Sequence, residues 1–213
     1  MSATLIYCYD PMCSWCWGFQ PTWKSLQHAL LPYIEKGELQ IQPMLGGLAV
    51  DSNAPMPIPM QNKLAGVWRQ IESQLGTNFN HDFWQTCQPR RSTYPACRAC
   101  LVARGQNLEA EMAHEIQQAY YLNAKNPSDL DTLAACANKI GLKEDGFLNA
   151  MEHCKKTEEL EQEIQIARQL GLNSFPSIAL VRANKLIPIA LDYLNADKML
   201  EDILQGLSEL ESG

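Results

Sequence analysis

Two short strand-like segments near the N-terminus constrain the fold of this chain more than any other feature. The first, residues 4–9, is apolar and rich in β-branched and aromatic side chains, and it stops at the turn-forming pair Asp10-Pro11. The second, residues 39–44, alternates apolar and polar side chains with the period of a strand. About thirty residues separate the two segments, which is enough for a crossover helix that places the strands parallel. The sequence therefore predicts a β-α-β unit of an α/β fold, whose ligands bind beyond the carboxyl ends of the strands.

A proline-rich segment, residues 53–59, separates this unit from a long helical region. Its alternating prolines disfavour a helix and favour an extended loop. Beyond it, apolar residues recur at helical spacing as far as residue 170. The predicted helices are 60–75, 95–104, 108–122, 128–140 and 157–170, with a short helical segment at 147–151. This whole region is therefore predicted to be helical.

The last part of the chain returns to strands and ends in a helix. Residues 177–181 and 186–191 predict a hairpin with its turn at Ala183-Asn184, and a helix is expected to begin near Asn195. Pro188 has no amide hydrogen, so its strand should lie at an edge of the sheet. The predicted order is β-α-β, a helical insertion, then β-β-α. The predicted boundaries are an N-terminal part at 1–52, a helical insertion domain at 53–170 and a C-terminal part at 171–213.

The charge balance and the apolar pattern exclude two classes of partner. The chain carries 24 acidic and 17 basic side chains, a net charge of −7, which is the wrong sign for a surface that binds phosphates. No apolar run approaches the roughly 18 residues that a membrane-spanning helix needs. The N-terminal residues show no basic segment, long apolar segment or small-residue cleavage site. We therefore expect a soluble, cytoplasmic protein with neither nucleic acid nor a membrane as its partner.

Among the 8 cysteines, Cys13 and Cys16 stand out by their position. They follow the first predicted strand directly and lie at the start of the predicted helix, where unpaired backbone amides and the helix dipole stabilise a thiolate. We therefore expect Cys13 to be a nucleophile. Cys16 lies one turn further in on the same helix face, more shielded and near enough to form a disulfide with Cys13. The spacing predicts a redox-active dithiol in which Cys13 attacks and Cys16 resolves.

The surroundings of this dithiol are also predicted from the sequence. Asp10 and Pro11 sharpen the turn, and Trp15 supplies apolar surface beside the sulfur. Two other interpretations stay open at this point: the cysteines are small core residues that happen to lie three apart, or they form half of a zinc or copper site. The position between a strand and a helix favours the redox interpretation.

The dipeptide Phe175-Pro176 lies directly before the first strand of the predicted hairpin. Only about one X-Pro bond in twenty is cis in folded proteins, so the dipeptide alone predicts a trans bond. Antiparallel pairing, however, brings the start of this strand to the end of the sheet where Cys13 lies. We therefore predict a cis bond next to the Cys13 sulfur, with the Phe175 backbone free to pair with an extended substrate.

A second C-x-x-C pair, Cys97 and Cys100, lies inside a predicted helix among alanine, leucine and valine residues. The favoured interpretation is that both thiols are inert groups packed in the core of the insertion. The alternative is a zinc site that adds Cys87 and His81, although their spacing is irregular for one.

Taken together, these segments resemble a known family. The strand, the Asp10–Cys16 segment DPMCSWC, the large helical insert and the Ser174–Ser177 segment SFPS before a hairpin resemble the DsbA-like branch of the thioredoxin superfamily, in particular its cytoplasmic FrnE-like members. The resemblance covers nearly the whole chain and includes the helix start TYPACRA at residues 93–99. It implies a thioredoxin fold with a large all-helical insertion, with Cys13 as the nucleophile, Cys16 as the resolving thiol and Pro176 as the cis-proline.

The resemblance and the dithiol lead to one expected function. We expect a thiol–disulfide oxidoreductase that acts on disulfides of proteins, peptides or small thiols, with glutathione as a potential co-substrate and no cofactor beyond its own redox-active disulfide. In a reducing compartment the expected net direction is reduction or isomerisation. Trp15, Ser174 and Phe175 are expected to bind the substrate, and Asp10 and Ser14 to tune the dithiol. Ser14-Trp15 contains neither the proline nor the histidine found between the cysteines of the strongly oxidising periplasmic members.

Two alternative functions differ from this one in class. A glutathione-dependent isomerase or transferase resembling the kappa class would activate glutathione with a single serine or cysteine, so it would have no use for both Cys13 and Cys16. A protein that binds soft metal ions would use Cys13, Cys16 and Met12 as ligands. The metal content of the purified protein separates this last alternative from the first two.

Overall fold

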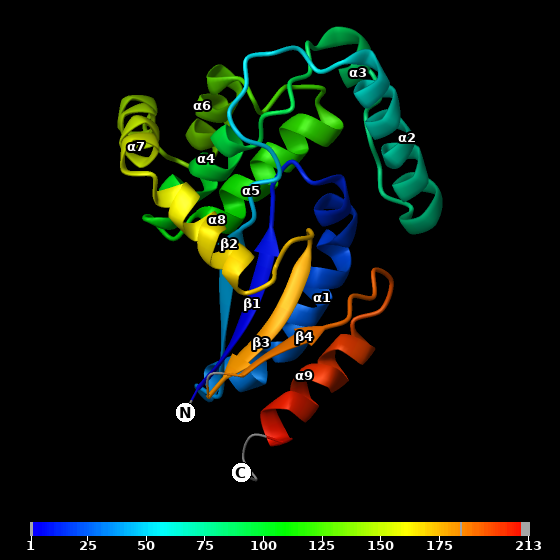
Figure 1. Ribbon diagram of the computed structural model, residues 1–213, viewed down its shortest axis with the longest axis vertical. Helices are drawn as coiled ribbons and strands as arrows, with labels where there is room; N and C mark the ends of the chain where they lie inside the picture. Colours follow the sequence, from blue (N-terminus) through cyan, green and yellow to red (C-terminus); the bar gives the residue numbers. More distant parts are fainter. Residues whose placement is uncertain (1, 184, 210–213) are drawn as a thin grey trace.

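Four strands form a mixed sheet in the order β2-β1-β3-β4 (Figure 1). This computed structural model describes residues 2–183 and 185–209, so Asn184 of the predicted turn lies outside the described residues. The strands are β1 (Ala3–Tyr9), β2 (Leu39–Leu45), β3 (Ser177–Arg182) and β4 (Lys185–Ile189). β1 is parallel to β2 and antiparallel to β3, which pairs antiparallel with β4. The predicted β-α-β unit and hairpin are confirmed, and Pro188 lies on the edge strand as expected.

The two faces of the sheet are covered by different helices because successive side chains of a strand point to opposite sides. Leu5 and Tyr7 of β1 pack in one core with α1 (Ser14–Glu35) and α9 (Asp197–Glu209). Ile6 and Cys8 point the other way, into a smaller core that is closed by α8 (Glu159–Gln169). The sheet is therefore a buried layer between helices, and both faces of β1 are apolar for that reason.

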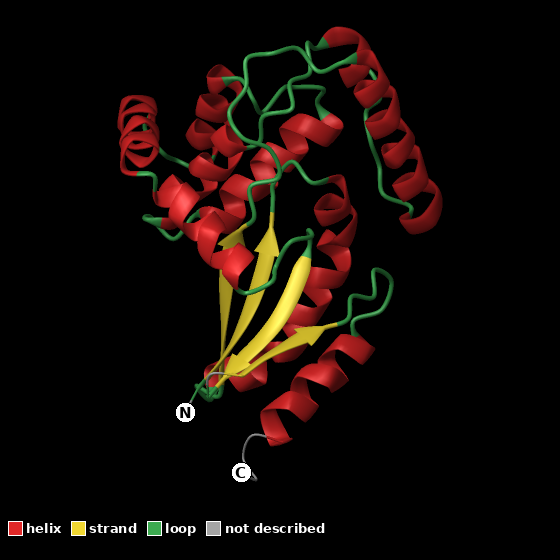
Figure 2. Cartoon of the chain, in the orientation of Figure 1, coloured by secondary structure: helices red, strands yellow, loops and turns green. Residues whose placement is uncertain are grey.

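The remaining helices lie beyond the carboxyl ends of β1 and β2 (Figures 1 and 2). They are α2 (Ile58–Leu75), α3 (Phe83–Thr86), α4 (Tyr94–Arg104), α5 (Glu109–Gln117), η1 (Gln118–Leu122), α6 (Leu130–Lys139) and α7 (Glu144–Thr157). None of the helices described is long and apolar enough to cross a membrane. The helical part thus sits over the end of the sheet at which ligands of α/β folds bind.

The structure corrects the predicted helices at two places. The segment 108–122 is not a single α-helix, because its last turn, η1, is π-helical. The segment 147–151 belongs to the longer helix α7, and the predicted helix start at Thr157 is wrong, since α7 ends there. Glu158 has a left-handed backbone with φ of 55°, which interrupts the helical hydrogen bonds and separates α7 from α8. The burial of Cys154 continues the apolar face of α7 beyond the predicted segment.

The helix α8 also bears on the predicted domain boundaries. It lies inside the predicted insertion 53–170, yet it packs on β2 and closes the smaller core of the sheet. The boundaries at 53 and 170 stay a prediction.

Candidate functional site

Cys13 is the N-cap residue of α1, directly beyond the carboxyl end of β1. Its backbone is extended, with φ of −81° and ψ of 116°, and its N–H donates to the carbonyl of Asp10 over 3.0 Å. Its side chain is 7% exposed, and its thiol donates a hydrogen bond to the carbonyl oxygen of Phe175 over 3.3 Å. The first turn of the helix directs its unpaired backbone amides toward this position.

Cys16 lies one turn further along α1 and is completely buried. Burial, followed by the hydrogen bond and the charge interaction with Cys13, raises the pKa of the Cys16 thiol well above its usual range. Both cysteines are free thiols in this structure. One sulfur is therefore partly accessible and its neighbour is shielded, as the spacing predicts.

The peptide bond between Phe175 and Pro176 is cis, which confirms the prediction. The Phe175 ring fixes the position of its backbone by close packing on Gly46, where an added Cβ would lie 1.9 Å from a ring carbon. The Arg168 guanidinium lies 5.1 Å from the centroid of the same ring and donates to the Gly46 carbonyl over 2.8 Å. Gly46 follows β2 directly, so a glycine just after a strand was the signal in the sequence for this close approach.

Asp10 is completely buried behind the turn that carries Cys13 and is not in contact with solvent. Its carboxylate accepts hydrogen bonds from the Met12 N–H over 2.8 Å and the Leu48 N–H over 2.7 Å. The Thr93 hydroxyl and the Cys97 thiol donate to it over 2.6 and 3.4 Å. Burial raises the pKa of Asp10 and these hydrogen bonds oppose that rise. The carboxylate thus joins the turn before Cys13, the loop after β2 and the start of α4.

The second cysteine pair is buried, but it is not surrounded by apolar groups alone. Cys97 and Cys100 are completely buried in α4. Cys97 donates to Asp10, and the Tyr9 hydroxyl, beside Cys100, donates to Glu109 over 3.0 Å. Burial is the main cause that raises the pKa of both thiols well above their usual range. The pair therefore supports the end of β1 through polar contacts that the sequence pattern did not reveal.

The other side chains of the alternative zinc site point elsewhere. His81 pairs with Glu72 over 2.9 Å, and the Cys87 thiol donates to the carbonyl of Ala124 over 3.0 Å. Within residues 2–183 and 185–209, no group of three or more His, Cys, Asp or Glu side chains is placed to hold a metal ion.

A cavity of about 280 Å³ opens beside Cys13. The predicted site residues that line it are Cys13, Ser14, Trp15, Ser174 and Phe175. Asp10, Cys16 and Pro176 are buried behind its surface. The cavity is completed by residues that were not among the predicted site residues, from the loop after β2, from α2, from the loop before α4 and from η1. These include Leu48, Met56, Leu64, Val67, Arg90, Arg91 and Tyr120.

The two residues between the cysteines connect the site to different parts of the molecule. The Ser14 hydroxyl accepts a hydrogen bond from the Trp68 indole over 2.9 Å, and Trp68 is completely buried in an aromatic cluster of the helical part. Trp15 instead packs edge-to-face against Tyr193, with ring centroids 5.3 Å apart. Ser14 therefore connects the start of α1 to the aromatic cluster through Trp68, a contact that the sequence analysis did not predict.

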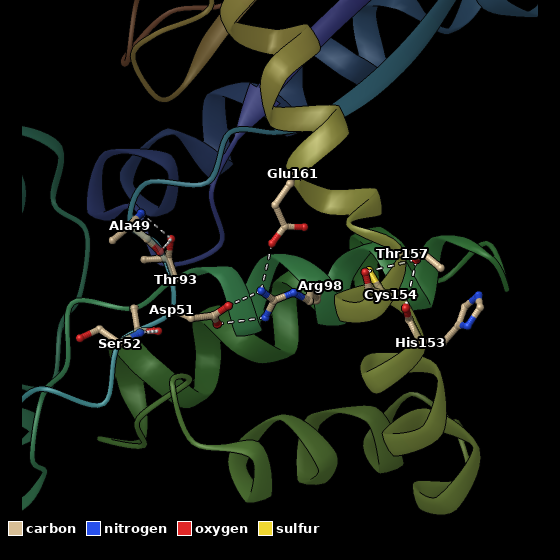
Figure 3. A network of polar contacts seen from close by, with 10 residues as sticks. Ala49, Asp51, Ser52, Thr93, Arg98, His153, Cys154, Thr157 and Glu161 are labelled. Carbon is tan, nitrogen blue, oxygen red and sulfur yellow. Dashed lines mark hydrogen bonds and ion pairs between the residues drawn. The ribbon is translucent and has the colours of Figure 1, made fainter.

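The loop after β2 is held by a polar network around Arg98 (Figure 3). Arg98 is 3% exposed and bonds both carboxylate oxygens of Asp51, one of them over 3.0 Å, and Glu161 of α8 over 3.2 Å. Thr93 accepts from the Ala49 N–H over 3.0 Å. Because α4, α8 and the loop share this network, the loop that supplies Leu48 to the cavity has a defined position.

A sheet of this order with a C-x-x-C at the start of its first helix and a cis-proline opposite defines a thioredoxin-like fold. The model of the DSBA-like thioredoxin domain family matches residues 4–198, and the chain belongs to this family. The fold class expected from the sequence, a thioredoxin fold with a helical insertion, is therefore confirmed.

Several known proteins are similar to this chain. A solved structure from Nitrosomonas europaea covers 99% of both chains with a TM-score of 0.80 and 22% identity, which shows the shared fold. The cytosolic disulfide reductase DsbM from Pseudomonas aeruginosa is 25% identical, with a TM-score of 0.70 over 98% of this chain and 97% of its own. A second structure of DsbM contains glutathione. The ClpXP adapter protein SpxH of Halalkalibacterium halodurans is 25% identical over 182 residues, which are 82% of this chain but 57% of SpxH.

Proposed function

We propose that this protein is a thiol–disulfide oxidoreductase whose Cys13–Cys16 dithiol exchanges with disulfides of proteins, peptides or small thiols. The observation that carries the proposal is the position of the Cys13 sulfur. It lies at a helix N-terminus, borders a cavity and is 3.3 Å from the carbonyl oxygen of Phe175, with a buried thiol one turn away. This arrangement offers an accessible nucleophile and a shielded partner that can close a disulfide with it.

The proposed reaction is two successive exchanges. The Cys13 thiolate attacks one sulfur of a substrate disulfide, forms a mixed disulfide and releases the other half of the substrate as a thiolate, which takes up a proton. The Cys16 thiolate then attacks the Cys13 sulfur, forms the Cys13–Cys16 disulfide and releases the remaining half. Two electrons pass from the protein to the substrate. A low-molecular-weight thiol such as glutathione restores the dithiol by two further exchanges and becomes a disulfide itself.

The environment of Cys16 suits its proposed role. Besides burial, the hydrogen bond and the charge of Cys13 raise the pKa of Cys16, so Cys16 keeps its proton while Cys13 is free. The mixed disulfide removes both of these effects of Cys13. The pKa of Cys16 then falls when Cys16 has to attack, although burial still holds it above its usual range.

Further roles follow for the residues around the sulfur. Phe175 offers its backbone to an extended substrate, while Trp15 and Ser174 line the cavity that receives the rest of it. Asp10 and Ser14 act as positioning residues, because each ties the turn that carries Cys13 to the helical part.

We also propose a cytoplasmic location and net reduction or isomerisation as the direction of the reaction. The similarity to DsbM, a cytosolic disulfide reductase with a second structure that contains glutathione, supports both this direction and glutathione as a co-substrate. The dipeptide between the cysteines, Ser14-Trp15, also lacks the residues of the strongly oxidising members.

Substitution of the two cysteines tests the proposal. Cys13→Ser should abolish the reduction of insulin and of glutathione disulfide, whereas Cys16→Ser should accumulate a mixed disulfide at Cys13 that mass spectrometry detects. If Cys16→Ser kept full turnover with glutathione, the single-thiol transferase would be the better hypothesis. If the purified protein retained a stoichiometric soft metal that blocked both thiols, the metal-binding alternative would replace the proposal.

A further inference from the structure

We infer that the cavity beside Cys13 selects disulfides that carry a carboxylate close to the sulfur, and that Arg91 is the cation that recognises it. This inference rests on the proposed function, because it names a substrate class for the same thiol. The carboxylate belongs to the part of the substrate that does not react, and the exchange between Cys13 and a disulfide does not by itself specify the charge of that part.

The charge of the cavity is opposite to the charge of the whole chain. Acidic side chains outnumber basic ones by 24 to 17, yet the residues that line the cavity include Arg90 and Arg91 and no aspartate or glutamate. Its other polar side chains, such as Asn173 and Ser174, are neutral. Apolar walls with one sign of charge concentrate the electric field in a cleft and raise the local concentration of the opposite ion.

The two arginines are not equivalent. Arg90 forms an ion pair with Asp129, so its charge is already compensated. Arg91 is exposed and makes no ion pair or hydrogen bond to any other residue that the structure describes. Arg91 lines the cavity, and its charge lowers the pKa of Tyr120, another lining residue, against burial and the charge of Asp10, which raise it. Arg91 is therefore an exposed cation of the cavity wall with no partner among the residues that the structure describes.

The remaining lining residues suit a short carbon chain between the sulfur and a carboxylate. Met12, Met56, Leu64 and Val67 supply flexible or branched apolar walls. A volume of about 280 Å³ lies at the small end of ligand sites, so the cavity receives one half of a small disulfide or a short peptide segment. An arginine binds a carboxylate with two parallel hydrogen bonds, which gives orientation as well as attraction.

A set of small disulfides that differ in charge tests this inference. The reduced protein is mixed with dithiodipropionate, bis(2-hydroxyethyl) disulfide or cystamine, which are anionic, neutral and cationic. Mass spectrometry follows the rate of mixed-disulfide formation on Cys13 in the Cys16→Ser background. Each rate is divided by the rate of the same disulfide with free dithiothreitol, which removes the intrinsic differences between the reagents. The normalised rate should be about tenfold higher for the anionic than for the neutral disulfide at low salt, and the ratio should fall at high salt.

Variants of Arg91 assign the effect to this side chain. Arg91→Ala should remove most of the anionic preference, and Arg91→Glu should make cystamine the fastest reagent. Arg69→Ala is the matched control, since Arg69 is an exposed arginine of α2 that does not line the cavity, and it should keep the preference. A peptide disulfide with glutamate or lysine beside the cysteine shows whether the carboxylate of a peptide is recognised in the same way as that of a small molecule.

The outcomes distinguish a failure of the proposed function from a failure of the proposed carboxylate preference. If no disulfide forms an adduct with Cys13, the proposed function fails. If all three react with equal normalised rates, or if Arg91→Ala keeps the wild-type ratio, this inference is overturned while the proposed function stands.

Discussion

The two C-x-x-C segments have the same spacing but opposite environments. Cys13 is an N-cap residue that borders a cavity, whereas Cys97 is the fourth residue of α4, and its own N–H is already bonded to the Thr93 carbonyl over 3.0 Å. The N–H of Cys97 is therefore used within its own helix, whereas Cys13 precedes the first turn of α1, whose amides have no acceptor within the helix. The difference teaches that the same spacing can occur in two different structural settings, and under the proposed function the place of the pair on its helix and its access to the cavity decide which one reacts.

The two segments are nevertheless connected through one carboxylate. Asp10 accepts from the Met12 N–H next to Cys13 and from the Cys97 thiol. The second pair thus contributes to the shape of the turn that carries the first. Four experiments test this difference between the two cysteine pairs, from the largest expected effect to the smallest.

Alkylation of the native, reduced protein tests the contrast directly. With iodoacetamide at neutral pH, Cys13 should react at least about a thousandfold faster than Cys97 or Cys100. The Cys97 and Cys100 thiols are fully buried, and burial raises the pKa of each so that it stays protonated. Burial also raises the pKa of Cys154 to about 11, so its thiolate fraction should increase about tenfold per pH unit below that value. Peptide mapping by mass spectrometry measures each site. Equal labelling of Cys13 and Cys97 would contradict the contrast.

Removal of the shared carboxylate should have the largest effect on stability. Asp10→Ala leaves the N–H groups of Met12 and Leu48 and the Thr93 hydroxyl without their acceptor, at a cost of about 3 kcal/mol or more. Urea denaturation measures the free energy of unfolding, and the exchange rate should fall as well because the turn before Cys13 loses its support. Glu152→Ala, at an exposed site, should change the stability by less than about 0.5 kcal/mol. A stable and fully active Asp10→Ala variant would break the proposed link.

Crowding the Phe175 ring should affect the first segment alone. Gly46→Ala places a methyl group 1.9 Å from the ring and should displace the Phe175 carbonyl from Cys13, which we expect to slow exchange about tenfold and to cost about 2 kcal/mol of stability. Gly66→Ala is the control, because no atom lies within 4 Å of its added Cβ, and it should stabilise α2 by about 0.5–1 kcal/mol. Insulin reduction and thermal unfolding measure the two effects. An unchanged exchange rate in Gly46→Ala would count against the role of the Phe175 backbone.

The smallest effect is expected for the second pair itself. The double variant Cys97→Ala, Cys100→Ala should keep the exchange rate within about twofold, because neither thiol lines the cavity. It should lose about 1–2 kcal/mol of stability, since the hydrogen bond from Cys97 to Asp10 disappears and two fully buried sulfurs are removed from the core. Insulin turnover and urea denaturation distinguish the two results. A large loss of activity at unchanged stability would reveal a redox or zinc role for Cys97 and Cys100.

Much of the local structure could be predicted from the sequence. The strands at 4–9 and 39–44, the helix that begins beside Cys13 and the edge position of Pro188 follow from apolar periodicity, turn residues and the missing amide of proline. A break between α7 and α8 was predicted, but its position at Glu158 was missed, because a glutamate gives no sequence signal for a left-handed backbone, which glycine or asparagine usually supplies. The π-helical turn η1 was missed for a similar reason, since its hydrogen-bond pattern has no distinct residue signature.

The amino-acid order by itself determined the dithiol, its place at a helix start and the facing cis-proline, because these depend on a few neighbouring residues and on the direction of the strands. Only the tertiary structure decided what surrounds them. Asp10 meets Thr93 and Cys97 across 83 and 87 residues of chain, and Arg91 borders the cavity because the helical part folds over the end of the sheet. Such contacts depend on how distant elements pack, and no periodicity within a single segment records that.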